Sequence, residues 1–347
     1  MITVRSGEFI WCCAMNRHNN EHGSAIIVVL LILSVMVIVS TNITVKYNSE
    51  FLRTANFING IQTKWYGVAS EELAARVLHQ DFEDNHNTIN LSGYWAAPER
   101  SFEVDGGTIR GYVQDDYSCL NINALGNSLY TARDDSDNRI NLAREVLYRL
   151  MVFLQIPADN AEEVADSITD MVDSDSNTLT FGAEDQFYRG QPYPFLIPNG
   201  YLFDVSEIRA AKGMSGSIYR RIAPFLCALN NNELKINVNT ISEFKSPLLA
   251  ALFLDDSVTV EDALEMISQR DINGWASISQ FLKLDMVESR ITRKNKAFFN
   301  SILMVNSGFF SMYTRVEYNN STMVYRSFFK RRNRYAELYK REYGGIE

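Results

Sequence analysis

The stretch GSAIIVVLLILSVMVIVSTNITV, residues 23–45, contains no charged side chain and lies near the start of a chain of 347 residues. As a helix rising about 1.5 Å per residue, the run from Ser24 to Val45 matches the ~30 Å hydrocarbon core of a bilayer. A cleaved secretory signal has a shorter apolar core, of roughly 7–15 residues, and a small-residue exit that is missing here. We therefore expect a retained membrane anchor.

The rest of the chain is expected to form a folded body on one side of the membrane, because no second apolar run of this length follows Val45. Basic residues stand on both sides of the anchor, at Arg17 and Lys46, so the positive-inside rule leaves its orientation open. The formal charge of −9 and the pI of about 5.1 disfavour contact with phosphate backbones. Nucleic acid is not an expected partner.

The apolar pattern predicts four further segments. Spacings of three and four from Phe51 to Val77 predict one helix of about 50 residues or more that begins in the anchor. RSFEVDGGTIRGYVQDD, residues 100–116, alternates around an Asp105–Gly106 turn signal and predicts a β-hairpin. A block of short helical patterns follows, and past Thr292 the period of two returns, which favours antiparallel strands.

These features predict an α+β fold, in which the long N-terminal helix packs on a small antiparallel sheet and a large, mainly helical domain is inserted between strands. The expected boundaries are a polar amino-terminal segment at 1–23, the transmembrane and amphipathic helix at 24–82, the first part of the α+β domain at 83–123, the inserted helical domain at 124–290 and C-terminal strands at 291–347.

The order of the features resembles the type IV pilin superfamily, where a polar leader ending in glycine precedes an uncleaved apolar helix that carries a small sheet. Within that superfamily, the helical insertion and several spaced motifs are similar to the minor pseudopilin K family of the type II secretion system. These motifs are, in chain order, CLNINAL, DMVDSD, GAEDQFY, VSEIRAAKGM, FLCAL and INVNT. The resemblance covers almost the whole chain.

The resemblance implies that a prepilin peptidase cuts after Gly23 and methylates the new amino terminus, Ser24. Most family members begin with phenylalanine, so Ser24 departs from the commonest pattern. The leader is also long for a prepilin, and we expect Met15 to be the true start, which would leave out Cys12 and Cys13. An ordinary signal anchor with a chance glycine is the alternative.

The fifth residue after the cut is Val28, where most pseudopilins have a glutamate. A carboxylate at membrane depth must find a positive partner, which in this superfamily is the amino terminus of the subunit ahead of it. A subunit with nothing ahead of it has no such partner, so Val28 favours a place at the filament tip. The large insertion favours the same place, because it is too bulky to repeat along a tightly wound filament. A valine that merely suits the membrane is the alternative.

The implied partners are the minor pseudopilins I and J, other pseudopilus subunits, the prepilin peptidase and the inner membrane, with the folded body in the periplasm. The implied role is assembly for protein export, without catalysis or a small-molecule substrate. No Gly-x-Ser-x-Gly elbow, phosphate loop or His-Glu-x-x-His motif occurs, and after Gly23 only His79 and His86 remain. Two rivals stay open: a minor pilin of a type IV pilus or competence system that contacts DNA, and a membrane-tethered periplasmic enzyme.

DSDSNTLTFGAED, residues 173–185, has oxygen-bearing side chains at the relative positions 1, 3, 5 and 12 of an EF-hand loop, although Thr178 stands where that loop needs glycine. The resemblance implies calcium near this acidic loop. The expected ligands are Asp173, Asp175, Glu184 and Asp185. A solvated loop with helix-capping aspartates is the alternative.

Other candidates have simpler expected roles. The cluster Asp134, Asp135 and Asp137 is expected to cap the next helix, with metal binding as the alternative. VSEIRAAKGMSGSIYRRI, residues 205–222, resembles a helix-hairpin-helix, but its glycine spacing and acidic surroundings favour packing over DNA contact. The asparagines of INVNT are expected to bond loop backbone groups, and these are Asn237 and Asn239.

Cys119 and Cys227 are the two cysteines of the folded body. In a periplasmic domain they suggest one disulfide that closes a long loop, and two unpaired buried thiols are the alternative.

Overall fold

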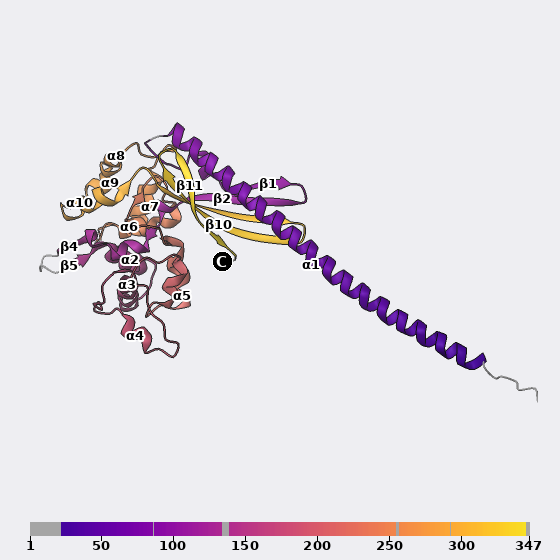
Figure 1. Cartoon of the computed structure of the whole chain (residues 1–347). Coiled ribbons are helices and arrows are strands. Elements are labelled where there is room, and N and C mark those ends of the chain that lie inside the picture. Colours follow the sequence, from indigo (N-terminus) through magenta and orange to yellow (C-terminus); the bar gives the residue numbers. More distant parts are fainter. Residues whose placement is uncertain (1–21, 86, 134–138, 255–256, 292, 345–347) are drawn as a thin grey trace, which may run out of the picture. The chain divides into compact units, whose positions relative to one another are not determined.

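A computed structural model describes residues 22–85, 87–133, 139–254, 257–291 and 293–344. The chain divides into two compact units, residues 1–59 and 60–347, and helix α1 (His22–Asp84) contributes to both. As far as it is described, the first unit is the apolar start of α1, and the second contains all the other elements (Figure 1). The remaining α-helices in the described residues are α2 (Leu142–Phe153), α3 (Ala158–Val172), α4 (Asp185–Arg189), α5 (Gly216–Ile222), α6 (Ser246–Ala251), α7 (Val260–Ser268), α8 (Ile278–Leu282), α9 (Asp285–Glu288) and α10 (Arg293–Ile302). The strands are β1 (Arg100–Val104), β2 (Gly107–Asp115), β3 (Leu120–Asn121), β4 (Thr131–Arg133), β5 (Arg139–Asn141), β6 (Leu226–Cys227), β7 (Ile236–Asn237), β8 (Leu303–Met304), β9 (Phe309–Tyr318), β10 (Ser321–Arg332) and β11 (Tyr335–Tyr343).

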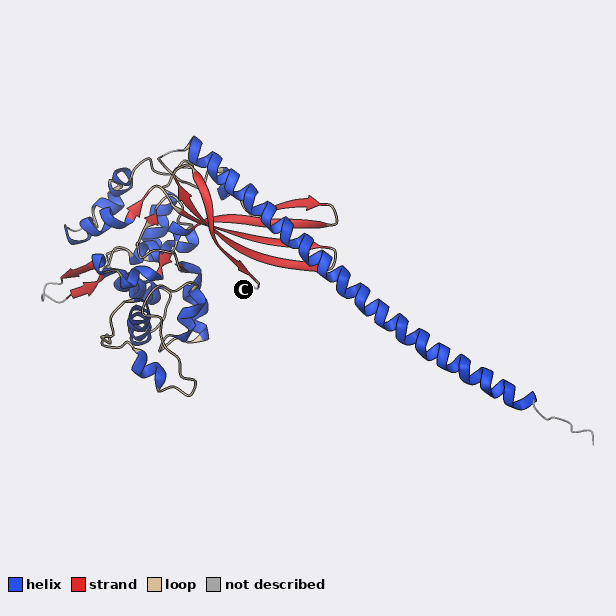
Figure 2. Ribbon diagram, viewed as in Figure 1, coloured by secondary structure: helices blue, strands red, loops and turns tan. Residues whose placement is uncertain are grey.

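Five antiparallel strands form the main sheet in the order β1-β2-β9-β10-β11 (Figure 2). The predicted hairpin is present as β1 and β2, and Gly106 at its turn has a φ of +80°, a conformation that favours glycine. Although β2 and β9 are neighbours in the sheet, residues 116–308 separate them in the chain and contain every α-helix after α1 that the structure describes. A helical domain is thus inserted between two adjacent strands, which confirms the predicted α+β fold.

Within the second unit, α1 packs on the sheet through buried Leu78 and Phe82. Closer to the start of this unit, Gly67 allows the helix to approach β10, since a Cβ at this position would lie 2.5 Å from the ring of Tyr325. The Tyr325 hydroxyl donates to the carbonyl of Thr63 at 3.1 Å. Gly67 lowers local helix propensity, and the close packing on the sheet explains its place there.

The buried asparagines of the inserted domain connect distant loops. Asn237 donates to the carbonyl of Ile89 at 3.0 Å and to a carboxylate oxygen of Asp115 at 3.1 Å. Asn239 donates to the carbonyl of Trp275 at 3.0 Å and accepts from the backbone N–H of the same residue at 2.7 Å. The predicted bonding of loop backbone groups by these two asparagines is confirmed.

One local prediction is wrong. The strands expected throughout 291–347 are preceded by α10, because Phe298, Phe299 and Ile302 pack into the core of the inserted domain and not on the sheet. The two-residue strand β8 also belongs to that domain, where it pairs in parallel with β7. The segment 205–210, part of the block expected to contain short helices, forms a 3-10 helix whose first turn is capped by Asp204.

Candidate functional site

The first candidate site is the start of α1, where Gly23 and Ser24 lie within the helix. Of the described residues, Ala25–Asp84 is the one helix long and apolar enough to cross a membrane, judged by length and composition alone. Its most apolar 18-residue window has a mean hydropathy of 2.8 and is not buried by the protein, and Val28 is 55% exposed. Such a surface needs a cover of lipid or of other apolar helices.

The acidic loop, residues 173–184, joins α3 to α4, and two carboxylates of α3 fix its backbone. Asp166 accepts from the N–H of Phe181 at 3.0 Å, and Asp170 accepts from the N–H of Leu179 at 3.2 Å. A Cβ at Gly182 would lie 1.9 Å from a carboxylate oxygen of Asp170, so a glycine is needed where the loop passes over it. The loop folds differently from an EF-hand, in which the glycine follows the third ligand.

Several oxygen atoms of this loop are buried without a hydrogen-bond donor. Among the described residues, Asp173 Oδ1 and both carboxylate oxygens of Glu184 have no partner. Burial, followed by repulsion from neighbouring carboxylates, raises the pKa of Asp173 to about 7, and burial also raises the pKa of Glu184. Asp175 accepts from the backbone N–H and the side-chain amide of Asn177 at 2.7 and 2.8 Å through a single oxygen. Buried acceptors that lack donors fit a cation.

Asp185 differs from the other expected ligands. One of its oxygens accepts from the N–H of Ile197 at 3.1 Å, and the other accepts from Arg189 at 3.1 Å. Conversely, Asn199 Oδ1 is buried without a partner, and the adjoining Gly200 N–H bonds to the carbonyl of Met171 just before the loop. Sequence reasoning missed Asn199, because it is far from the acidic run in the chain. Its backbone is left-handed, with a φ of +43°, which asparagine adopts more readily than most residues, so the residue type alone does not indicate a binding role.

In the part of the chain that the structure describes, no three carboxylate, imidazole or thiol side chains are close enough together to hold a metal ion by themselves. Calcium takes six to eight oxygen ligands, and these include amide and backbone carbonyl oxygens and water. The donor chemistry of the acidic loop therefore fits calcium, while the side-chain carboxylates alone do not complete a site. The second acidic cluster, Asp134, Asp135 and Asp137, lies outside the described residues, as does His86.

Cys119 and Cys227 form a disulfide with their Cα atoms 5.8 Å apart. Cys119 precedes β3 and Cys227 ends β6, and these two short strands pair in parallel. The bridge lies in a buried cluster with Tyr117, Leu229 and Phe309, the first residue of β9. It thus fastens the segment that leaves the sheet after β2 to the middle of the inserted domain.

Comparison with known proteins decides the family. The family described as "Type II secretion system (T2SS), protein K" matches the chain over residues 118–231 and again over 236–298. A type II secretion system protein K of Pectobacterium carotovorum is 31% identical over 332 residues, covering 94% of this chain and 98% of that protein. The chain belongs to the type II secretion system protein K family.

Other members of the protein K family agree with this assignment. The protein K of Aeromonas hydrophila is 37% identical over 257 residues, covering 74% of this chain and 77% of that protein. A solved chain from the GspK–GspI–GspJ complex of enterotoxigenic Escherichia coli matches with a TM-score of 0.76 and 28% identity, covering 84% of this chain and 99% of that one. The chain is a minor pseudopilin of type II secretion, and its relatives are structural subunits of that system.

Proposed function

We propose that this protein K is processed as a prepilin, stays anchored in the inner membrane with its folded body in the periplasm, and caps the tip of the pseudopilus without acting as an enzyme. The observation that carries the proposal is the uncharged start of α1, with Val28 as the fifth residue after Gly23. A carboxylate there would need the amine of a subunit ahead. The capping subunit has no such neighbour.

The topology of the sheet supports the tip position. The inserted domain enters after β2 and returns at β9, so its residues 116–308 form the larger part of the second unit. A helical filament repeats one contact geometry between successive subunits, and each subunit must fit under the next. An insertion of this size is most easily accommodated where no further subunit is added.

The proposed partners are the minor pseudopilins I and J. The solved relative comes from a complex with GspI and GspJ, and 84% of this chain aligns with it. A membrane-anchored subunit with a large periplasmic domain would bring that assembly together below the outer membrane and transmit force during protein export.

Processing is tested at the amino terminus. Mass spectrometry of the full-length protein extracted from membranes should find Ser24 as an N-methylated first residue, because cleavage after Gly23 exposes it. The control is the same protein from cells without the prepilin peptidase, which should keep its leader. Retention of Met1 or Met15 in cells that have the peptidase would contradict the prepilin proposal.

We also propose that the acidic loop binds a structural calcium ion through Asp173, Asp175 and Glu184, with Asn199 as an added ligand and Asp185 outside the set. The buried oxygens of Asp173, Glu184 and Asn199 without donors support this choice. Bound calcium would supply the positive charge that these acceptors lack and would stiffen the connection from α3 to α4. Asp166 and Asp170 would keep their present role of holding the loop backbone.

Calcium is expected to raise the thermal stability of the protein. At a free concentration 100 times the Kd, a ligand that binds only the folded state adds about 2.7 kcal/mol, so a chelator should lower the Tm by several degrees. Glu184→Gln should remove most of this calcium-dependent shift. Asp185→Asn is the matched control and should keep it. Equal Tm values with calcium and with chelator would contradict the site.

A further inference from the structure

The sheet has a second face, which points away from α1. Along β10, the side chains of Tyr325 and Ser327 bond to α1, so Arg326 between them lies on the opposite face. Tyr313 of β9 is the register partner of Arg326 and lies on the same face. The side chains of this second face are therefore available to the inserted domain and not to α1.

A cavity of about 880 Å³ lies between this face and the inserted domain, and we call it the β10 pocket. Strands β2, β9, β10 and β11 line it on one side, and the 3-10 helix at 205–210, α5 and the segment before α6 line it on the other. Two aromatic residues of its lining, Phe244 and Tyr343, are 63% and 55% exposed. Its volume is in the range of ligand-binding clefts, about 300–1,000 Å³.

Two charged side chains of the β10 pocket are buried without a direct ionic partner. Asp116 is 2% exposed; its Oδ1 accepts from Ser311 at 2.7 Å, and its Oδ2 has no donor among the described residues. Lys245 is 6% exposed, and its Nζ donates to the hydroxyl of Ser118 at 3.1 Å. Burial raises the pKa of Asp116 to about 6 and lowers the pKa of Lys245 to about 8. Both shifts show that each charge is costly as it stands.

Arg326 is the third charge of the β10 pocket. Its guanidinium lies over the rings of Tyr313 and Phe328, 4.9 and 4.8 Å from their centroids. Its Nε is buried, and within the described residues it has no acceptor. Aromatic rings bind the flat face of a guanidinium but leave the N–H groups on its edge unused. The edge of Arg326 is thus free to bind an anion.

The positions of these groups on the sheet place them together. Ser311, which holds Asp116, and Tyr313, under Arg326, are two residues apart on β9, or about 7 Å along the strand. Lys245 bonds to Ser118, which belongs to the same short turn as Asp116. One unpaired carboxylate oxygen therefore lies near two cations with unused donors.

The other carboxylates that line the β10 pocket have partners of their own. Asp204 caps the 3-10 helix that follows it, and Glu342 pairs with Lys340. Neither is available to neutralise Arg326 and Lys245. A ligand that compensates the buried charges must bring an anionic acceptor for the two cations and, next to it, one donor for Asp116.

We propose that the β10 pocket binds the carboxyl-terminal end of a peptide. The carboxylate lies between Arg326 and Lys245, the last backbone N–H donates to Asp116, and an apolar or aromatic last side chain lies against Phe244. A phosphate dianion fits worse, because it offers no donor to Asp116 and is repelled by it. A free amino acid leaves much of the volume empty. This inference goes beyond the proposed tip position and calcium site and depends on neither.

The first test is calorimetric titration of the full-length protein in detergent micelles with the peptide acetyl-Ala-Ala-Phe. The free acid should bind saturably, and the carboxyl-amide of the same peptide should bind at least about tenfold more weakly, because it cannot form the charge-assisted bonds. This comparison uses the wild type alone, so no variant has to fold. Equal affinity of acid and amide, or no binding of the acid at millimolar concentration, would overturn the proposal.

Variants then locate the bound carboxylate. Arg326→Gln should weaken the binding of the acid at least about tenfold and leave the weak binding of the amide unchanged. Arg332→Gln is the matched control, since Arg332 is on the same strand, is 77% exposed and does not line the pocket; it should bind like the wild type. Equal loss of acid and amide binding in Arg326→Gln would show a merely structural role and overturn the assignment.

Competition identifies the class of ligand. Inorganic phosphate and free phenylalanine should each displace the peptide acid only at concentrations at least about tenfold higher than the peptide needs. Phosphate that competes as well as the peptide would overturn the proposal in favour of a simple anion site. Phenylalanine that competes as well would overturn it in favour of a free amino acid.

Discussion

Replacing both Cys119 and Cys227 by serine is expected to lower the free energy of unfolding by about 5 kcal/mol, on the chain-entropy account of a loop closed over 108 residues. The cysteines lie in a buried cluster that includes Tyr117 and Phe309, so the bridge fastens the segment that leaves the sheet to the middle of the inserted domain and packs against the start of β9. Urea titration of the full-length protein in detergent micelles, followed by tryptophan fluorescence, would measure the loss.

A reducing agent provides the control for this prediction. Added to the wild type, it should shift the unfolding midpoint toward that of the double serine variant. Added to the variant, it should leave the unfolding midpoint unchanged. An unchanged midpoint of the wild type after full reduction would contradict the stabilising role of the bridge.

Substituting Gly23 by valine is expected to reduce type II secretion to the level of a strain without protein K. A branched side chain directly before the cut should block the prepilin peptidase, and an uncleaved leader keeps a polar segment at the end of α1 that has to enter the filament. Secreted enzyme activity in the culture medium, together with the size of the membrane-bound protein, measures both effects.

The neighbouring position supplies a matched control for the Gly23 variant. Ser24→Phe introduces the first mature residue that is commonest in the superfamily, so it should be cleaved and should support secretion. Normal secretion by a strain whose Gly23→Val protein keeps its leader would contradict the need for processing.

The sequence was sufficient for the parts of the fold that depend on local pattern. An apolar run without charges predicted the start of α1, and Asp105–Gly106 predicted the β1–β2 turn. The pattern was misleading at α10, because Phe298 and Phe299 are equally compatible with a strand, and only their contacts with the distant helical core decide for a helix.

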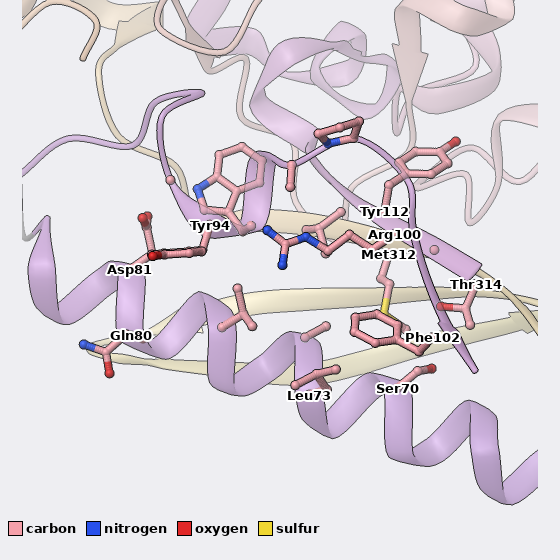
Figure 3. Close-up of a pocket in the computed structure, with 18 of the residues that line it drawn as sticks. Ser70, Leu73, Gln80, Asp81, Tyr94, Arg100, Phe102, Tyr112, Met312 and Thr314 are labelled. Atoms are coloured by element: carbon pink, nitrogen blue, oxygen red, sulfur yellow. The ribbon is translucent and has the colours of Figure 1, made fainter. Parts of the chain in front are cut away.

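The candidate sites show the same limit. The spacing of Asp173, Asp175 and Glu184 was visible in the chain, but the unpartnered oxygen of Asn199 depends on how a later loop folds back. The cavity between α1 and strands β1, β2 and β9 (Figure 3) could not be predicted at all. Its existence depends on which strands α1 covers, and that is decided by contacts such as the one between Glu71 and Arg341, which are far apart in the sequence.

The position of protein K on the isolated pseudopilus tests most directly the claim that it caps the tip. Isolated pseudopili from cells that carry an epitope-tagged protein K would be labelled with gold-conjugated antibody and imaged by electron microscopy. We predict label at a single end of each fibre, since a subunit with Val28 and this insertion has no neighbour ahead of it. Label at regular intervals along the shaft would contradict the account.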